Sequence, residues 1–207
     1  MVKISVSFLG TDNKIEVIKK INQTDADYIH VDIADGKFVT SKTDPFNEMN
    51  KLLSNANKKL DVHLMVQNPS KYIEEYALLN TDCITIHSEI KDIKKHLTNI
   101  KNYGLKCGLA INPETPVEKI MPYINDINRV LIMSIEPGYS GQTFISSVLP
   151  KAIEIKNINK NILVAIDGGI NEDNNDLCIA AGIDIICSAT FVTGSSDFQY
   201  QITKLRR

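Results

Sequence analysis

The sequence lacks the features that mark nucleic-acid-binding, membrane-spanning and secreted proteins. Its formal net charge is -2, so no surplus of Lys and Arg is available for a phosphate backbone. No apolar run is long enough to span a bilayer, and the first residues contain no signal-peptide hydrophobic region. These absences predict a protein of the cytoplasm that binds neither nucleic acid nor membranes.

The cysteines are few and widely separated. There are four, and no two of them form a CxxC pair: Cys83, Cys107, Cys178 and Cys187. Each lies in an apolar stretch, which is typical of buried, reduced thiols in the cytosol. The sequence therefore gives no support for a disulfide framework or a thiolate metal site.

Eight short β-branched runs alternate with longer amphipathic stretches along the chain. The runs are Lys3 to Phe8, Tyr28 to Ile33, Leu60 to Leu64, Cys83 to Ile86, Lys106 to Ala110, Arg129 to Met133, Ile162 to Ile166 and Asp184 to Cys187. Such alternation predicts a parallel sheet with crossover helices, and several runs are apolar throughout, as expected for strands covered on both faces.

Eight strand-helix units favour closure into a (β/α)8 TIM barrel of the α/β class. The alternative is an open doubly wound sheet, but the glycine-rich GxGxxG turn typical of that fold does not follow the first strand. The 207 residues are enough for one well-buried core and few for two ordinary domains. We therefore expect residues 1–207 to form a single barrel domain.

Three local signals predict helix boundaries. Pro69 suits the first turn of a helix, and Gly104 suits a helix end before the fifth strand. Thr115 followed by Pro116 is typical of a capped helix start with Pro at the first helical position. The Lys-rich stretch from 91 to 101 predicts an exposed helix face, on which His96 would be solvated.

Histidine and aspartate recur at the ends of three predicted strands. His30 and Asp32 alternate on the second strand and so share one face, His63 lies near the end of the third, and Asp167 ends the seventh. In a barrel, the carboxyl ends of all strands converge on one mouth. Singly, each residue is better explained as a satisfied polar group or a turn residue. Together they predict a site for one divalent metal, with Zn²⁺, Mn²⁺, Fe²⁺ and Co²⁺ all suited to imidazole and carboxylate ligands.

Glycine-rich loops follow the last three strands. They comprise Pro137 to Gln142, the pair Gly168 and Gly169, and Ser188 to Thr190. Glycine lets backbone N–H groups approach an anion closely, and barrel enzymes often bind phosphate at these loops. One such loop would be read as a plain turn, but three in consecutive units predict a phosphate site. Within it we expect Gly138, Tyr139, Ser140, Gly141, Gly168, Gly169, Ala189 and Thr190 to contact the substrate.

Five segments resemble the signature blocks of the ribulose-phosphate 3-epimerase family, in the family's order and across essentially the whole chain. The segments are His30 to Val39, Asp61 to Val66, Asn112 to Pro116, Met133 to Gln142 and Asp167 to Ile170. The related allulose-6-phosphate 3-epimerases share most of these blocks. The resemblance implies a ribulose-phosphate-binding barrel that interconverts D-ribulose 5-phosphate and D-xylulose 5-phosphate in the pentose phosphate pathway.

The resemblance also assigns roles to individual residues. It implies a divalent metal held by His30, Asp32, His63 and Asp167, with Asp32 and Asp167 also serving as the acid and base around a metal-stabilised enediolate. It implies substrate contacts from Ser7, His63, Met65 and Met133, the last two of which would otherwise be read as core residues. It further implies a homo-oligomer.

Two departures from the family pattern leave alternatives open. Ala34 stands where the family usually has a methionine, and Ser140 replaces a glycine of the phosphate loop. The alternatives are epimerisation of allulose 6-phosphate and a catalytically impaired barrel that only binds sugar phosphates. Decarboxylases and synthases that act on ribulose-type phosphates use an Asp-x-Lys-x-x-Asp motif at a strand end, and the corresponding segment here, His30 to Asp35, contains no lysine.

Overall fold

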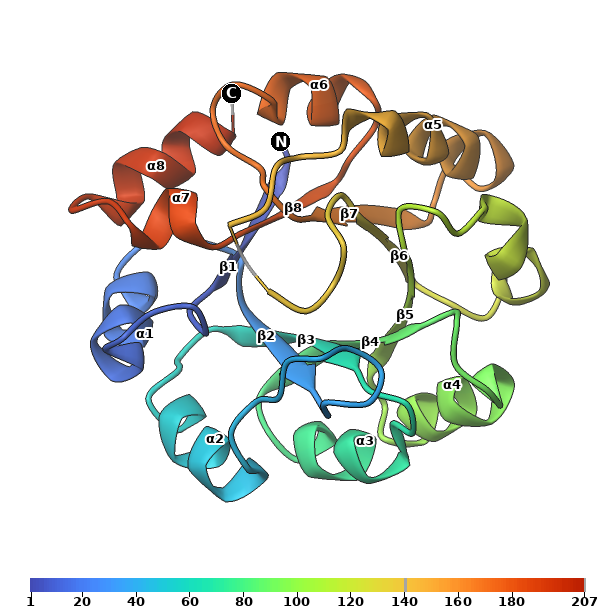
Figure 1. Cartoon of the computed structure of the whole chain (residues 1–207), viewed down its shortest axis with the longest axis horizontal. Coiled ribbons are helices and arrows are strands. Elements are labelled where there is room, and N and C mark those ends of the chain that lie inside the picture. The colour runs from blue at the N-terminus through green and yellow to red at the C-terminus, as the bar shows by residue number, and fades with distance from the viewer. Residues whose placement is uncertain (140, 207) are drawn as a thin grey trace.

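A closed barrel of eight parallel strands forms the centre of the computed structural model, which describes residues 1–139 and 141–206 (Figure 1). The strands are β1 (Lys3–Ser7), β2 (Tyr28–Ala34), β3 (Lys59–Met65), β4 (Thr81–His87), β5 (Lys106–Ile111), β6 (Arg129–Met133), β7 (Leu163–Asp167) and β8 (Ile185–Ser188). Each strand pairs with its neighbours in chain order, and β8 pairs with β1. The predicted α/β TIM barrel is confirmed, with strand ends that differ from the predicted ones by up to two residues.

Helices surround the barrel on its outer side (Figure 1). They are α1 (Lys14–Asn22), α2 (Phe46–Leu53), α3 (Ser70–Ala77), α4 (Ile93–Asn102), α5 (Leu149–Ile158), α6 (Asn175–Ala180), α7 (Thr190–Thr193) and α8 (Phe198–Leu205), together with the 3₁₀ segments η1 (Val117–Tyr123) and η2 (Ser146–Val148). No helix among the described residues is both long and apolar enough to cross a membrane.

Two separate apolar clusters follow from the alternation of side chains along each strand. Strand residues that point outward, such as Ile29, Val62 and Ile166, pack under the helices in the larger cluster. A smaller cluster, which includes Ala110, Leu131 and Ala165, fills part of the barrel interior. Other interior positions are polar, among them His30, Asp61 and Arg129, so the barrel core carries buried charges.

Strand register sets the height at which the predicted site residues meet. Asp32 on β2 pairs with His63 on β3, Ser7 on β1 pairs with His30, and Met133 on β6 pairs with Asp167 on β7. Ser7, Met133 and Asp167 end their strands, Asp32 and His63 lie two residues before the ends of theirs, and His30 lies one pleat deeper in β2. A slip of one residue would turn each side chain to the opposite face of the sheet.

The helix boundary signals have mixed outcomes. Pro69 directly precedes α3, and Gly104 follows α4 with φ of 73°, as predicted. Thr115 does not cap a helix, because Pro116 is extended, η1 begins at Val117, and the Thr115 hydroxyl is bonded elsewhere. The expectation for Thr115 and Pro116 is therefore wrong.

The prediction for His96 is also wrong. Its side chain is 5% exposed, on the inward face of α4 with Ile93, Leu97 and Ile100. The spacing of three and four residues places His96 among these apolar residues, and the neighbouring lysines concealed this pattern. The four cysteines are buried and free, as expected.

Candidate active site

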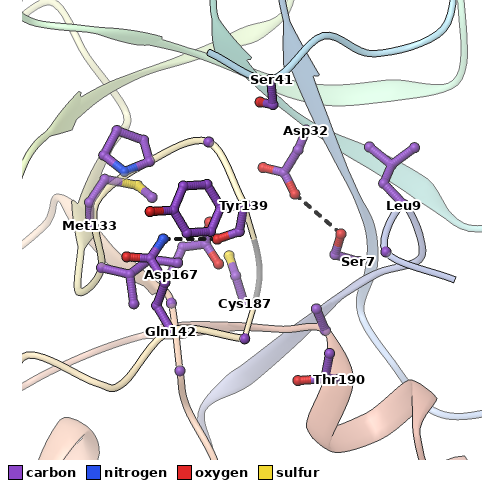
Figure 2. A pocket seen from close by; sticks show the side chains of 18 of the residues that line it. Ser7, Leu9, Asp32, Ser41, Met133, Tyr139, Gln142, Asp167, Cys187 and Thr190 are labelled. Atoms are coloured by element: carbon purple, nitrogen blue, oxygen red, sulfur yellow. Dashed lines mark hydrogen bonds between the residues drawn. The ribbon is translucent and has the colours of Figure 1, made fainter. Parts of the chain in front are cut away.

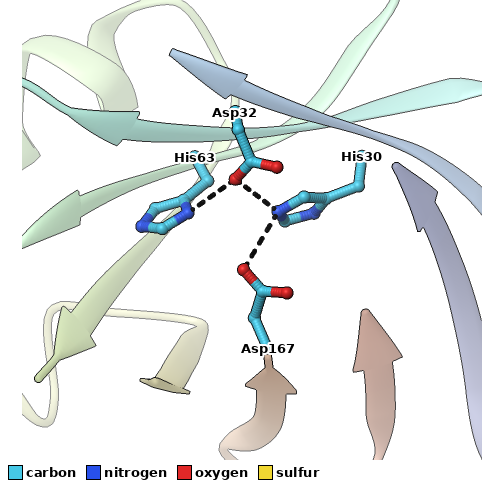
Figure 3. A group of neighbouring side chains, drawn as sticks. All are labelled: His30, Asp32, His63 and Asp167. Carbon is cyan, nitrogen blue, oxygen red and sulfur yellow. Dashed lines mark hydrogen bonds and ion pairs between the residues drawn. The ribbon is translucent and has the colours of Figure 1, made fainter. Parts of the chain in front are cut away.

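The two histidines and two aspartates predicted to bind a metal lie together at the carboxyl end of the barrel. One ligand atom of each lies within 4.8 Å of those of the others. Asp32 Oδ1 is 3.1 Å from His30 Nε2 and 3.0 Å from His63 Nδ1. Asp167 approaches from the opposite side, with Oδ2 3.9 Å from His30 Nε2 (Figure 3). The imidazoles are buried, whereas the two carboxylates remain about one fifth exposed (24% for Asp32 and 20% for Asp167).

The ionisation of the two carboxylates is pushed in opposite directions. Burial would raise the pKa of Asp32, but the positive charge of His30 and hydrogen bonds from His30 and His63 hold that pKa far below its ordinary value. Burial, and then the negative charge of Asp32, raises the pKa of Asp167 to about 6. Such a separation between neighbouring carboxyl groups is typical of acid and base pairs.

The buried ion pair of Asp61 and Arg129 supports His30 at Nδ1, the ring nitrogen that does not face Asp32. His30 Nδ1 lies 3.1 Å from Asp61 Oδ2, which also accepts a hydrogen bond of 2.9 Å from the Ser5 hydroxyl. The other oxygen of Asp61 pairs with the guanidinium of Arg129, and both side chains are about 2% exposed. A carboxylate on the far nitrogen of a metal-binding imidazole fixes the ring and its tautomer. Our sequence interpretation assigned no role to Asp61 or Arg129, although the two-residue spacing of Asp61 and His63 puts both on one face.

A second buried chain lies behind His63. His63 Nε2 is 2.8 Å from His87 Nε2, and His87 Nδ1 is 3.1 Å from Glu89 Oε2. From the sequence alone, His87 can be interpreted either as reaching the mouth or as supporting the loop, and Glu89 was not identified. The available signal was the alternation of Thr85, His87 and Glu89 across the end of an apolar strand.

A cavity of about 600 Å³ opens onto the two aspartates. Ser7 lies in its wall, and its hydroxyl donates to Asp32 Oδ2 over 3.2 Å (Figure 2). The predicted substrate contacts that line the cavity are Ser7, Met65, Met133, Gly138, Tyr139, Gly141, Gly168, Gly169, Ala189 and Thr190. His63 is fully buried and is not among the lining residues, and Ser140 lies outside the described residues.

The glycine loops of this cavity depend on the lack of a side chain. Gly168 has φ of 120°, and a Cβ atom there would lie 2.4 Å from Ile135 Cγ1. Gly169 has φ of 67°, and its Cβ would lie 2.8 Å from the backbone nitrogen of Phe144. The chain after β7 therefore packs directly against the loop after β6. Lys42 is the one basic side chain among the described lining residues, so an anion here would depend largely on backbone N–H groups.

Several lining residues were not among the predicted substrate contacts, although three of them, Pro137, Gln142 and Ser188, belong to the predicted glycine-rich loops. They are Leu9, Gly10, Ala34, Ser41, Lys42, Thr43, Ile135, Pro137, Gln142, Ile170, Asn171, Cys187, Ser188 and Phe191. Ser41, Lys42 and Thr43 come from the long connection after β2, which an isolated bridge between Asp35 and Lys42 folds back on itself. Sequence gives little signal for such a contact, because it depends on how the loop closes.

Comparison with solved structures gives barrels that act on phosphorylated compounds. KGPDC from Streptococcus mutans superposes with a TM-score of 0.74 at 12% identity, over 100% of this chain and 96% of that one. 3-Hexulose-6-phosphate synthase from Salmonella typhimurium gives a TM-score of 0.72 at 11% identity, over 99% and 96% of the two chains. At these identities the likeness shows the fold alone.

Comparison of sequences is more specific. The chain is 35% identical to ribulose-phosphate 3-epimerase from Bacillus subtilis over 100% of its own length and 99% of the relative's. It is 34% identical to the Helicobacter pylori enzyme of that name, over 99% and 96% of the two chains. The sequence model described as the ribulose-phosphate 3 epimerase family matches residues 2–193. With the barrel and the paired aspartates already in place, this match over nearly the whole length shows that the chain belongs to the ribulose-phosphate 3-epimerase family.

Proposed function

We propose that this protein inverts C3 of a ketose phosphate, interconverting D-ribulose 5-phosphate and D-xylulose 5-phosphate in the pentose phosphate pathway. The observation that carries the proposal is the pair Asp32 and Asp167. Their carboxylates come from opposite parts of the barrel, β2 and β7, and face one cavity lined by glycine loops. Membership of the epimerase family gives the reaction class.

The four clustered side chains suit a divalent cation. Two imidazoles and two carboxylates offer donor atoms within 4.8 Å of one another, and this mixed set matches Zn²⁺, Mn²⁺, Fe²⁺ or Co²⁺. We therefore propose that His30, Asp32, His63 and Asp167 hold one such ion. When bound, it would supply electrostatic stabilisation to the negative charge that develops on the substrate as C3 loses its proton.

The two aspartates would move the protons. One carboxylate takes the proton from C3, and the other returns a proton to the opposite face, which inverts the centre. A single base would tend to return the proton to the face from which it came. The pKa of Asp32 lies far below its ordinary value and that of Asp167 is raised to about 6, so Asp167 is the stronger base of the two and its pKa is the closer to neutral pH, which suits a group that takes and returns a proton.

Other residues of the cavity would bind and enclose the substrate. The Ser7 hydroxyl, which donates to Asp32, would contact a substrate oxygen beside the reacting carbon. Met65 and Met133 line the cavity and would exclude water, which strengthens electrostatic interactions at C3. Backbone N–H groups of the loops after β6, β7 and β8 would hold the phosphate.

Exchange of the C3 proton tests the proposal directly. D-Ribulose 5-phosphate is incubated in D₂O with the protein as purified, after chelation, and after addition of Mn²⁺ or Zn²⁺, and followed by NMR. We expect deuterium at C3 together with xylulose 5-phosphate, lost on chelation and restored by the metal. Binding of ribulose 5-phosphate without any exchange in the metal-loaded protein would refute the proposal and favour a barrel that only binds sugar phosphates.

A six-carbon ketose phosphate is the second candidate, and Ala34 is the observation that favours it. This small side chain lies at the end of β2 and lines the cavity beside Met65, with which it pairs across the strands. A short side chain at this point leaves room for a longer substrate. The ratio of kcat/KM for allulose 6-phosphate and ribulose 5-phosphate decides between the two.

Two further expectations stay predictions. The family resemblance implies a homo-oligomer, which sedimentation of the purified protein would test. The sequence also predicts a cytoplasmic location, which cell fractionation would test.

A further inference from the structure

A chain of hydrogen bonds runs from His63 through His87 and Glu89, and so connects the proposed metal site to the loop after β5. His63 and His87 are both fully buried, and Glu89 is 22% exposed. The two imidazole rings stack with centroids 5.0 Å apart, and the ring of Phe38 packs on His87 with centroids 4.5 Å apart. These packing contacts hold the ring of His87 in one orientation, so that the direction of each hydrogen bond in the chain can be worked out.

The carboxylate at the end of the chain sets that direction. Glu89 can only accept, so His87 Nδ1, 3.1 Å from Glu89 Oε2, carries a proton. A neutral His87 then has a lone pair on Nε2, and a contact of 2.8 Å between two imidazole nitrogens needs one donor and one acceptor. When a cation replaces the hydrogen bond between His63 Nδ1 and Asp32, His63 Nε2 must therefore donate to His87, which leaves the Nδ1 lone pair of His63 for that cation.

Glu89 is itself held in place by the loop after β5. Its Oε1 accepts hydrogen bonds from the backbone N–H of Asn112 and from the Thr115 hydroxyl. The Lys151 ammonium donates to the carbonyl oxygens of Asn112, Pro113 and Thr115. The carboxylate is thus anchored at one oxygen and free to accept from His87 at the other.

We propose that His87 and Glu89 are positioning residues, which fix His63 in the tautomer whose Nδ1 lone pair points into the metal site. This inference rests on the proposed metal role of His63. His30 receives the equivalent support directly from Asp61 at its Nδ1, so the two imidazoles present different ring nitrogens, Nε2 from His30 and Nδ1 from His63. The plain alternative is that Glu89 only anchors the loop after β5.

Glu89→Gln is the decisive substitution because it would reverse the donor and acceptor roles in the hydrogen bonds that link residue 89, His87 and His63. The amide oxygen of the new side chain would stay with its two donors, Asn112 N–H and Thr115, and its NH₂ group would face His87 Nδ1. His87 would then accept at Nδ1 and donate from Nε2, which forces His63 to carry its proton on Nδ1. Loss of such a support typically weakens metal binding by ~10–100-fold.

Two matched variants separate positioning from loop anchoring. Thr115→Val removes one hydrogen bond from the loop to Glu89 and leaves the contact between Glu89 and His87 intact. Glu114→Gln makes the same change of charge on an exposed residue of the same loop. If Glu89 only anchors the loop, Thr115→Val should lower the unfolding midpoint, Glu89→Gln should largely keep it because both loop hydrogen bonds remain, and metal affinity should be unchanged in both variants.

The experiment has two readouts besides activity. Long-range ¹H–¹⁵N NMR of the Zn²⁺-loaded protein identifies which nitrogen of each histidine carries the proton once the metal has replaced the contact between His63 Nδ1 and Asp32. Competition with a chelator gives the Co²⁺ affinity, and the visible spectrum of bound Co²⁺ reports its ligands. We expect Nε2–H on His63 and Nδ1–H on His87 in the wild type, and Co²⁺ affinity reduced by ~10–100-fold in Glu89→Gln alone among the three variants.

Each contrary result has a distinct meaning. Nε2–H in place of Nδ1–H on His87 in the Zn²⁺-loaded wild type, or unchanged Co²⁺ affinity in Glu89→Gln, would overturn the positioning role and leave the epimerase proposal standing. A wild-type protein that binds neither Zn²⁺ nor Co²⁺ would remove the proposed metal site, and the positioning role with it.

Discussion

At the scale of single residues, side chains of the same chemical type in the site differ in their neighbours and therefore in their properties. Asp32 and Asp167 are both aspartates at strand ends, yet hydrogen bonds from two histidines lower the pKa of Asp32 while burial raises that of Asp167. The two histidines likewise differ, since His30 is backed by Asp61 and His63 by His87. Chemical type alone therefore does not define what each of these side chains does.

The first prediction concerns Asp167. Asp167→Asn keeps the shape of the side chain but removes its ability to take or give a proton, so kcat should fall by ~10²–10⁴-fold. Coupled-enzyme rates and C3 deuterium exchange measure the loss. Asp173→Asn, an exposed change in the loop after the same strand, is the control and should leave both unchanged. Near-normal turnover of Asp167→Asn would rule out the two-aspartate scheme.

At the scale of elements, the loops after β6, β7 and β8 line the cavity, and the strands hold the four side chains of the proposed metal site. His30, Asp32, His63 and Asp167 lie on strands, whose register is fixed by the barrel. The proposed phosphate contacts lie on the loops after β6, β7 and β8, which touch one another at glycines. Changes at these glycines should therefore affect binding more than proton transfer.

The second prediction tests this division at Gly168. In Gly168→Ala the added methyl group would meet Ile135 at 2.4 Å and would also occupy an unfavourable φ of 120°. The loop must shift, so we expect KM for the ketose phosphate to rise by about tenfold or more. Gly104→Ala is the control, because it also has positive φ but meets nothing within 4 Å and lies after α4. An equal KM in both variants would contradict the loop assignment.

At the scale of the whole molecule, the barrel interior is stabilised in part by charge. Arg129 and Asp61 form an ion pair inside the barrel, where neither is accessible to water. Removing one partner of such a pair leaves the other charge buried and uncompensated. Stability therefore depends on interior polar groups that also support the proposed metal ligands.

The third prediction follows from this pair. Arg129→Met retains much of the apolar volume but leaves Asp61 unpaired, so the free energy of unfolding should fall by about 3–5 kcal/mol. Urea unfolding of the metal-free protein measures it. Lys106→Met, which breaks the exposed pair with Asp82, should cost at most about 1 kcal/mol. A similar small loss in Arg129→Met would show that the buried pair contributes little.

The fourth prediction concerns acid stability of the metal-free protein. Burial lowers the pKa of His87 to about 4, against about 6.5 in the unfolded chain. Between these values the unfolded state binds more protons at this histidine, so the contribution of His87 to the free energy of unfolding falls as pH decreases from about 6.5 to about 4. His87→Phe removes this contribution. Urea midpoints measured across the range should therefore depend less on pH in His87→Phe, and parallel curves would refute the assignment.

The sequence by itself determined the fold class and the polar residues at the mouth. Eight apolar runs with intervening amphipathic stretches specify a parallel barrel, because strands buried on both faces need apolar residues throughout. His30, Asp32 and Asp167 could be placed at one mouth because parallel strands of a barrel end at the same edge. A single domain over residues 1–207 was part of this interpretation and stays a prediction.

Only the tertiary structure decided which groups stand behind those residues. Asp61 and Arg129 lie 68 positions apart, and Glu89 receives the Thr115 hydroxyl from 26 positions away. His96 was wrongly predicted to be solvent-exposed because the lysines beside it in the sequence suggested an exposed helix face, whereas its side chain points inward. Local patterns report which face of an element is apolar, whereas the partner of a buried charge depends on strand register and loop closure, which are set by the whole barrel.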